Sequence, residues 1–281
     1  MGESIKNRFG ARIIGIVTAA NRTDPAIWDA LPVCDIVELR ADGFAPADIP
    51  GVARELKQEC LRKLGHPLEM LLTIRLQRDG GAWPDAEARA RIPLWQRLGL
   101  HARDPACDWI DVEVEEFAAL TEPERVGIAS GSARLLLSHH DMRKSLPLPE
   151  LRTMLEGMKA FRPAGMKFAL RYASREELIE LLRFAPEVAA ATPNGCLLGM
   201  GGGAGRVLAP LLGCPLTYGY LCGGAVAPGQ LSVISLDRFY HGLERNPADG
   251  KIDSGLLDWA EARILKTLPE SGWNEGDMLA D

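Results

Sequence analysis

An alternation of apolar runs and helix-like segments, repeated eight times, restricts the fold of this chain more than any other feature. Each apolar run is short and almost continuously hydrophobic, which is typical of parallel strands that are covered by helices on both faces. The runs begin at Arg12, Ile36, Met70, Trp109, Arg134, Met166, Cys196 and Pro215. Eight such units predict an α/β fold, a (β/α)8 TIM barrel, in a single domain.

The alternative is an open α/β sheet, whose commonest form carries G-x-G-x-x-G directly after its first strand. This chain has no such motif there, so we place a barrel at residues 1–245. Residues 246–281 fall outside the eight units. We expect them to form a C-terminal extension with a short helix at Leu256–Leu268 and an acidic tail, docked through Trp259 or Leu265.

Several intervening segments carry recognisable helix starts and stops. Asp48 precedes a segment that we expect to be capped there, to be helical through Leu64 and to end at Gly65. Ser174, with Glu177 three residues later, forms a capping box that predicts the start of another helix. The last helix of the barrel is expected at Gln230–Leu243.

The composition is that of an ordinary globular protein, with 47% hydrophobic and 25% charged residues. The formal net charge is −6 and no basic tract is present, which argues against nucleic acid as a partner. No apolar run is long enough to span a membrane, and the first ten residues lack a signal-peptide core. The six cysteines form no C-x-x-C pair and no zinc-type spacing with histidine. We therefore expect a soluble cytoplasmic protein with buried, reduced cysteines.

One lysine, Lys167, lies inside a strand-like run, the segment 165–170. Burying an ammonium is costly unless it is paired or loses its proton. A neutral buried amine is a nucleophile that can form a Schiff base with a ketone. The alternative is a lysine at the mouth of the strand with its charged end in water. Acids, arginines and a histidine at the ends of other predicted strands favour the first interpretation.

Two adjacent histidines, His139 and His140, stand near the end of the fifth predicted strand. Neighbouring residues of a strand point to opposite sides, so only one of them can face the mouth of a barrel. A single histidine is more often structural than catalytic, but this one ends the strand next to that of Lys167. A histidine that titrates near neutral pH is the proton carrier that a Schiff-base lysine needs.

Charged side chains also mark the second and fourth predicted strands. Glu38, Arg40 and Asp42 are spaced two residues apart, which places them on one side of a strand. An inward polar cluster is more favourable than their burial against the helices. Asp111 and Glu113 share one side of the fourth strand in the same way, and for Glu113 we expect an ion pair with a neighbouring arginine.

Two glycine-rich loops follow the seventh and eighth predicted strands. The segment 201–206 lacks the G-K-[ST] of a P-loop, but Arg206 at the start of a helix can clamp a carboxylate or a phosphate. The segment 223–230 has glycines on both sides of a small apolar tip, which predicts a lid that brings Gln230 over the ligand. An ordinary surface loop is the alternative.

These motifs together resemble those of the type I 3-dehydroquinate dehydratases, Schiff-base enzymes of the shikimate and quinate pathways, over roughly residues 12–245. The matching segments are V-E-L-R-A-D at 37–42, T-I-R with a following G-G at 73–81, S-H-H-D at 138–141, M-K-F-A at 166–169, M-G-G-G-A-G-R at 200–206 and A-P-G-Q at 227–230. The resemblance implies a (β/α)8 barrel, usually a homodimer, that works without metal or organic cofactor on a carboxylated, hydroxylated cyclic ketone.

The resemblance also implies a role for each candidate residue. Lys167 would form the imine with the ketone, and His140, supported by Asp79, would move the protons. The implied reaction is the syn elimination of water from 3-dehydroquinate to give 3-dehydroshikimate. The substrate-binding candidates, the first three for the ring hydroxyls and the next two for the carboxylate, are Glu38, Arg40, Arg75, Arg206, Gln230 and Thr18.

Four positions depart from the family pattern. Asp79 stands in place of a glutamate, Gly205 and Val226 stand in place of serines, and Arg171 lies in a run that is normally apolar. Because the catalytic pair is intact, these differences bear on the substrate more than on the imine chemistry. Two alternatives stay open: a Schiff-base enzyme of the same family acting on a related cyclic keto acid, and a non-catalytic ligand sensor of the quinate pathway.

Overall fold

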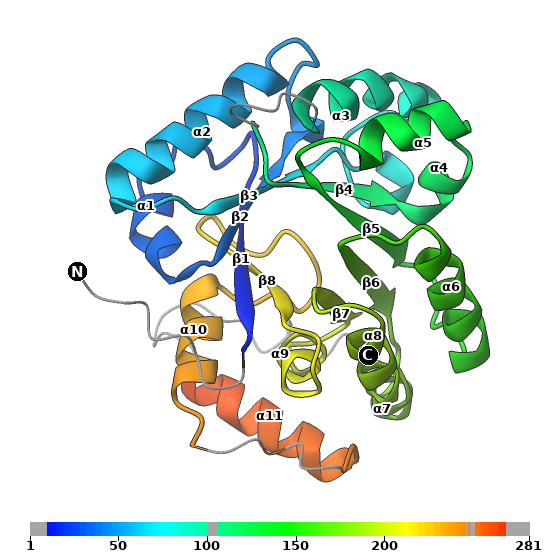
Figure 1. The fold of residues 1–281 in the computed structure, drawn as a ribbon. Coiled ribbons are helices and arrows are strands. Elements are labelled where there is room, and N and C mark those ends of the chain that lie inside the picture. Colours follow the sequence, from blue (N-terminus) through cyan, green and yellow to red (C-terminus); the bar gives the residue numbers. More distant parts are fainter. Residues whose placement is uncertain (1–9, 100–105, 245–246, 248–250, 268–281) are drawn as a thin grey trace.

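The computed structural model describes residues 10–99, 106–244, 247 and 251–267. Its eight strands pair in the order β7-β6-β5-β4-β3-β2-β1-β8, and all pairs are parallel. Because β8 pairs with β1 and also lies beside β7, the sheet curls into a nearly closed barrel (Figure 1). The strands are β1 (Arg12–Val17), β2 (Ile36–Arg40), β3 (Glu69–Thr73), β4 (Trp109–Glu113), β5 (Arg134–Asp141), β6 (Gly165–Arg171), β7 (Gly195–Met200) and β8 (Leu216–Tyr220). The predicted (β/α)8 barrel is confirmed, and the open sheet is wrong.

Helices and short 3-10 turns connect the strands and cover the outside of the barrel (Figure 1). The α-helices are α1 (Ile27–Ala30), α2 (Ile49–Leu64), α3 (Ile92–Gly99), α4 (Val114–Ala118), α5 (Glu122–Ala129), α6 (Leu148–Ala160), α7 (Arg175–Arg183), α8 (Ala185–Ala191), α9 (Ala204–Leu211), α10 (Val233–His241) and α11 (Ser254–Thr267). The 3-10 turns are η1 (Leu31–Val33), η2 (Ala41–Gly43), η3 (Gln77–Asp79) and η4 (Asp85–Arg91).

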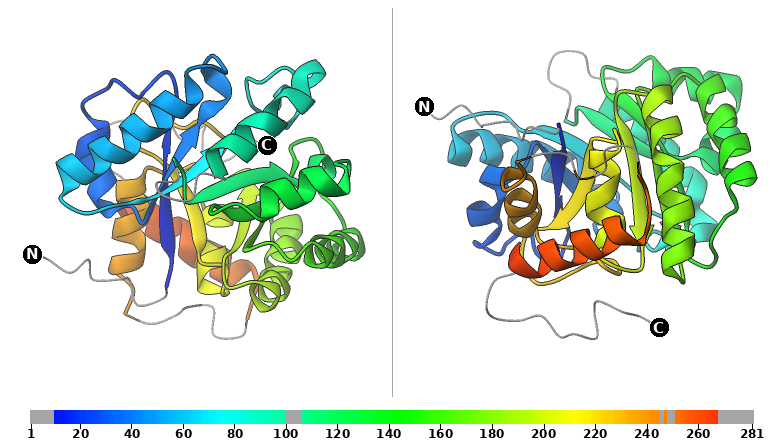
Figure 2. Two further views of the ribbon diagram at one scale, coloured as in Figure 1. Left: turned by 45° about the horizontal axis from the view of Figure 1, so that its top comes forward. Right: turned by 90° about the horizontal axis from the view of Figure 1, so that it is seen from below.

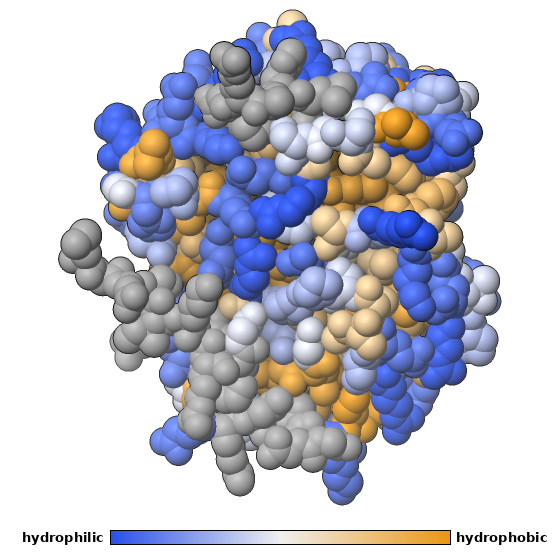
Figure 3. All heavy atoms as spheres, viewed as in Figure 1, coloured by the Kyte–Doolittle hydropathy of each residue, from blue (hydrophilic) through white to orange (hydrophobic). Residues whose placement is uncertain are grey.

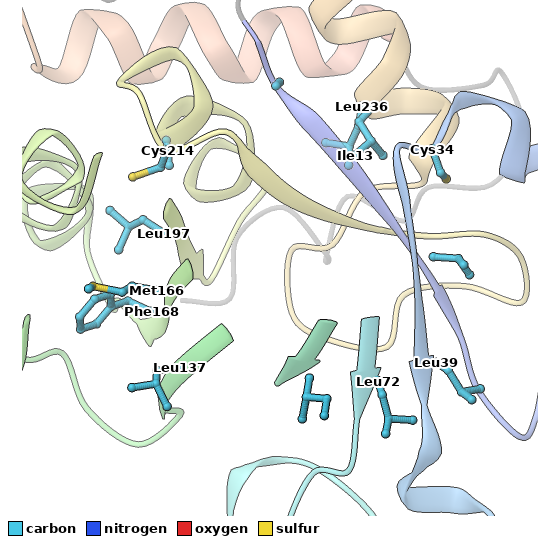
Figure 4. Close-up of a cluster of buried hydrophobic side chains, with 14 of the residues drawn as sticks. Ile13, Cys34, Leu39, Leu72, Leu137, Met166, Phe168, Leu197, Cys214 and Leu236 are labelled. Carbon is cyan, nitrogen blue, oxygen red and sulfur yellow. The ribbon is translucent and has the colours of Figure 1, made fainter. Parts of the chain in front are cut away.

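Apolar side chains form one layer outside the barrel and a smaller cluster inside it. The outer layer joins strands to helices and includes the residues labelled in Figure 4, among them Leu39, Leu72, Leu137, Phe168 and Leu197. The inner cluster consists of Ile14, Ile16, Ile36, Leu71, Trp109, Leu136, Ala169, Cys196, Leu198, Met200, Leu216 and Tyr218. Burial on both faces explains why the strands read as almost continuous hydrophobic runs. Other buried positions of the strands are occupied by polar residues, such as Glu38, Asp111 and Lys167.

The helix ends test two of the expected caps. Gly65 ends α2 as expected, in a left-handed conformation with φ of 76°. Asp48 precedes α2, but its backbone is helical rather than extended and its side chain makes no capping hydrogen bond, so the expected side-chain cap is wrong. Ser174 accepts the amide of Glu177, and the Glu177 carboxylate accepts the amide of Ala173, one residue before the partner that a capping box requires.

The C-terminal extension is packed onto the barrel through α11. This helix lies across the outer side of α10, α9 and α7 (Figures 1 and 2). Trp259 meets Phe239 of α10 edge to face, with ring centroids 5.8 Å apart, as expected for a docking residue. Leu265 is 53% exposed, so its expected docking role is wrong. The acidic tail and the predicted end of the helix at Leu268 lie outside the described residues.

On the face that Figure 3 shows, hydrophilic side chains are widespread and apolar side chains gather in several areas between them. No helix in the part of the chain that the structure describes is long and apolar enough to cross a membrane. All six cysteines are free, and all but Cys222 are buried.

Helix α9 approaches β7 so closely that only a glycine fits at the contact. A Cβ atom built on Gly205 would lie 2.7 Å from the carbonyl oxygen of Gly199 and 2.9 Å from its Cα. These neighbours are backbone atoms of a buried strand, which cannot move aside cheaply. The missing serine at position 205 therefore has a steric reason.

We expect Gly205→Ala to lower the free energy of unfolding by about 1–3 kcal/mol, as overpacking of a close contact does. The matched control is Gly157→Ala in α6, where a Cβ would meet nothing within 4 Å. That substitution should raise the stability by up to about 1 kcal/mol, because alanine favours a helix more than glycine. Urea denaturation of both variants checks the pair, and equal effects would contradict the steric explanation.

Candidate active site

A cavity of about 280 Å³ opens at the carboxyl ends of the barrel strands. Its lining includes most of the residues that the sequence singled out, together with apolar and lid residues: Ile16, Glu38, Arg40, Arg75, Asp79, Gly80, His140, Met142, Lys167, Ala169, Leu198, Met200, Arg206, Tyr218, Val226, Ala227, Pro228 and Gln230. The parallel register brings side chains from different strands to one level of the barrel.

Lys167 is buried inside the barrel and is held between a carboxylate and an aromatic ring. Its Nζ lies 3.1 Å from Oδ2 of Asp111 on β4 and 4.2 Å from the ring centroid of Tyr218 on β8. The alternative, a lysine with its charged end in water, is therefore wrong. Neither partner was assigned to the lysine from the sequence, because strand spacing does not reveal contacts across a barrel.

Asp111 joins the lysine to a network of buried charges. Arg75 lies 2.7 Å from its carboxylate, and the hydroxyl of Ser138 donates to it at 2.5 Å. Burial would raise the pKa of Asp111, but Arg75 and Lys167 together lower it well below its usual range. Asp111 is therefore a permanent anion in the site.

The guanidinium of Arg75 has several protein partners. Besides Asp111, it donates to Glu113, Ser138 and Nδ1 of His140 over 2.9, 3.1 and 3.2 Å. Burial would lower its pKa, but the two carboxylates raise it. Arg75 lines the cavity, yet its main contacts hold the site together, whereas the resemblance implied a role toward ring hydroxyls.

His140 is the histidine that faces the cavity, whereas His139 points away and bonds Glu115 at 2.5 Å. The prediction that only one of the pair faces the mouth is confirmed. Burial, followed by the positive charges of Arg75 and Lys167, lowers the pKa of His140 well below its usual value. His140 is therefore neutral near pH 7. A guanidinium can only donate, so Nδ1 accepts from Arg75 and the proton resides on Nε2.

Asp79 lines the cavity near His140 without a hydrogen bond to it in the described part of the chain. Its ion pair is with Arg78, at 3.6 Å. Burial and then the negative charge of Glu113 raise the pKa of Asp79 to about 6. The hydrogen bond to His140 comes from Arg75, so a supporting role for Asp79 stays a prediction.

Glu38 and Arg40 of β2 both line the cavity, as the inward cluster predicted. Glu38 is buried and accepts the hydroxyl of Thr73 at 2.6 Å. Arg40 forms a two-pronged ion pair with Asp42, at 2.9 and 3.2 Å. Thr18 does not line the cavity, because it closes a turn with Asn21.

Arg206, in the first turn of α9, is a buried cation with no carboxylate partner among the described residues. Its Nη2 donates to the carbonyl oxygen of Pro228 at 2.8 Å and contacts the Met200 sulfur at 2.9 Å. Its Nε is buried without a hydrogen bond. Burial lowers the pKa of Arg206 to about 10, so the group stays charged near neutral pH. Such a cation is ready to receive an anionic group of a ligand.

The lid residue Gln230 is buried beside Arg206 in the lining of the cavity. Its Oε1 accepts the amide of Val226 at 2.9 Å, which fixes the side chain and keeps the amide nitrogen as a donor. The last barrel helix, α10, begins only at Val233, because Ser232 caps it. The predicted helix start at Gln230 is therefore wrong. Arg171, at the exposed end of β6, does not line the cavity.

Two side chains of the site escaped the sequence reasoning. Arg91 is fully buried and pairs with Glu113 at 2.8 Å, which supports the expected ion-pair role of that glutamate. Tyr218 stacks under Lys167, and its hydroxyl is buried without a partner in the described part of the chain. The signal for Tyr218 was its place two residues after the buried strand start at Leu216, on the inward side.

Comparison with known proteins agrees with this geometry. Residues 14–247 match the family model of the type I 3-dehydroquinases. The chain is 33% identical to a 3-dehydroquinate dehydratase of Methanosarcina mazei, over 71% of this chain and 81% of that protein. It is 28% identical to the Coxiella burnetii enzyme of the same name, over 73% and 81% of the two chains.

Solved structures of the same kind share the fold. The 3-dehydroquinate dehydratase of Geobacillus kaustophilus superposes with a TM-score of 0.65 and 22% identity, over 84% of this chain and 93% of that one. The type I enzyme of Clostridium difficile gives 0.63 and 21%, over 82% and 92%. The fold and site therefore define a barrel enzyme with a buried lysine. The chain belongs to the type I 3-dehydroquinase family.

The unpaired hydroxyl of Tyr218 is expected to lower the stability of the ligand-free protein. A buried hydroxyl without a partner costs about 1–3 kcal/mol, so Tyr218→Phe should raise the free energy of unfolding of the ligand-free protein by about 1 kcal/mol or more. The matched control is Tyr240→Phe, which removes a hydrogen bond of 3.0 Å to Val207 and should lower stability. Denaturation curves of both variants check the signs; a loss of stability in Tyr218→Phe would contradict the assignment.

Proposed function

We propose that the chain dehydrates 3-dehydroquinate to 3-dehydroshikimate through an imine on Lys167. The observation that carries the proposal is the pairing of two groups on adjacent strands. A buried lysine amine and a neutral histidine line the same cavity, next to a buried cation with no anion of its own. Membership of the family supports the same reaction.

The chemistry begins when His140 takes a proton from the Lys167 ammonium, and the amine that is left attacks the ketone carbon. The carbinolamine that forms loses water and becomes an iminium ion. Removal of a proton from the adjacent carbon then moves its electron pair into the C=N bond, giving an enamine. The enamine expels the β-hydroxyl, which takes up a proton and leaves as water. Hydrolysis of the new imine consumes one water, so the net change is the loss of one water from the substrate.

His140 is the group that carries the protons. Its low pKa keeps the ring able to accept a proton from the lysine ammonium or from the substrate carbon. The same ring can return that proton to the leaving hydroxyl, which places both events on one face of the substrate and gives syn elimination. The anion of Asp111 stabilises the positive nitrogen at Lys167 throughout.

The remaining polar residues of the cavity recognise the substrate. Arg206 and Gln230 are proposed to bind its carboxylate, since one is an unpaired buried cation and the other presents an amide donor. Glu38 and Arg40 are proposed to bind ring hydroxyls from the opposite strand. The Clostridium difficile structure holds covalently modified comenic acid, which is consistent with covalent chemistry in enzymes of this fold.

The homodimer that the resemblance implies and a location in the cytoplasm stay predictions. The substrate is proposed to be a small molecule. Within the described ranges, no group of three or more histidine, cysteine, aspartate or glutamate side chains is placed to hold a metal ion.

The deciding experiment traps the imine. The protein is mixed with 3-dehydroquinate and borohydride, and the intact and peptide masses are measured. We expect a reduced adduct on Lys167 and no turnover in Lys167→Ala, because no other amine lines the cavity in the described chain. The matched control is Lys159→Ala, which removes an exposed lysine paired with Glu156 and should behave like wild type.

The outcomes separate the three interpretations of the sequence. An adduct and turnover together support the dehydratase. No adduct with 3-dehydroquinate but an adduct with another cyclic keto acid would point to a changed substrate. Binding of 3-dehydroquinate with no adduct and no turnover, unaffected by Lys167→Ala, would point to a sensor.

The role of Arg206 predicts a loss of substrate affinity. Arg206→Ala should raise the KM for 3-dehydroquinate by about two to three orders of magnitude, because a buried charge pair is worth about 2–5 kcal/mol when one partner is removed. Arg206→Lys keeps the charge but loses the fork of donors, so its KM should lie between. Arg183→Ala, which removes an exposed ion pair with Glu180, is the control. An unchanged KM in Arg206→Ala would remove this residue from the site.

A further inference from the structure

The helix that carries Arg206 is unusual among the outer helices of this barrel. Every residue of α9, from Ala204 to Leu211, is buried. An outer helix of a barrel normally buries one stripe and exposes the other to water. Here α11 covers the outer side of α9 (Figure 2). This covering helix lies beyond residue 247, where the match to the family model ends.

One side chain of α11 reaches the turn that positions Arg206. A Cβ built on Gly203 would lie 3.0 Å from Cδ1 of Ile264, so the isoleucine sits directly against this glycine. Gly203 is the residue before α9, and its carbonyl oxygen accepts the amide of Arg206 at 2.9 Å. Ile264 is only 2% exposed. It therefore packs against the residue from which the first turn of α9 begins.

The same contact extends to the lid. Leu231, which follows Gln230, lies 3.6 Å from the Cβ position of Gly203. Ile264 of the extension and Leu231, the residue after the lid, thus both adjoin Gly203. Arg206 is therefore linked to α11 through a single residue, Gly203.

Polar contacts fix α11 in this place. Arg175 at the start of α7 pairs with Asp258 and Glu261 at 2.5 and 2.9 Å. Arg263 donates to the carbonyl oxygen of Phe239 on α10 at 3.2 Å. The extension is clamped to the helices on both sides of α9, so it can act as a rigid support.

We propose that α11 is a positioning element of the active site and that Ile264 is its key residue. By packing against Gly203, Ile264 fixes the first turn of α9 and so the place of the Arg206 guanidinium that receives the substrate carboxylate. The role of Arg206 in this statement rests on the proposed function. The inference assigns the C-terminal extension to substrate binding.

The test compares two deletions of buried methyl groups in one helix. Ile264→Ala should raise the KM for 3-dehydroquinate by about tenfold and leave kcat and the Lys167 adduct at saturation unchanged. Leu257→Ala, two turns earlier in α11 and also fully buried, is the matched control. It should lose stability to a similar extent and keep the wild-type KM. Ile264→Val should restore most of the affinity.

A double variant separates positioning from general loosening. In Arg206→Ala the guanidinium is absent, so adding Ile264→Ala should raise the KM no further. An additive effect, or equal KM changes in Ile264→Ala and Leu257→Ala, would overturn the proposal.

Binding of shikimate, a hydroxylated ring carboxylate without a ketone, keeps this test independent of the imine chemistry. Calorimetry should show weaker binding in Ile264→Ala than in Leu257→Ala even if 3-dehydroquinate is not turned over, in which case only the proposed reaction fails. Equal affinity of both variants for shikimate, or no binding of shikimate to the wild type, would overturn the positioning role of α11. Adduct formation on Lys167 could still be correct in that case.

Discussion

The shared carboxylate of Asp111 is the contact on which the rest of the site depends. It is fully enclosed, and Arg75, Lys167 and Ser138 all bind it. Removing one partner of a buried pair typically costs about 3–5 kcal/mol, because the other charge is left without compensation. Each member therefore keeps the others in place. The lysine is held inside the barrel and Arg75 is held where it bonds His140, so one anion orients both the proposed nucleophile and the proposed proton carrier.

This network reaches from the barrel interior to its outer layer. Glu113 accepts Arg75 on one side and Arg91 on the other, and Arg91 also donates to the carbonyl oxygen of Ile74 and stacks on Trp95. A fully buried arginine on a connecting segment thus braces the strands that carry the site. The apolar layers around it exclude water, which strengthens each of these charge interactions.

The barrel could be predicted from the sequence because each buried strand is a short apolar run, which is a local signal. The positions of Lys167 and His140 could also be predicted, because both follow from where those strands lie and end. The partner of Lys167 could not be predicted, because Asp111 is far from it in the sequence and the two meet only when the barrel closes. Gln230 was misplaced in a helix because a cap at Ser232 decides the start. Arg91 carries no local pattern at all. Contacts that depend on closure escape an analysis of spacing.

The hydrogen bond from Arg206 to the carbonyl oxygen of Pro228 couples the buried guanidinium to the lid. The guanidinium that we propose to bind a carboxylate thus also holds the lid. In the same loop Gly229, with a φ of 65°, lies so close to Gly202 that a Cβ on it would be 2.6 Å from the Gly202 backbone. If binding of a carboxylate stabilises one conformation of the lid, thermodynamic linkage requires that this conformation binds the carboxylate more tightly by the same free energy. A change in the flexibility of this loop would therefore alter how tightly acids bind, with no change in any group that touches them.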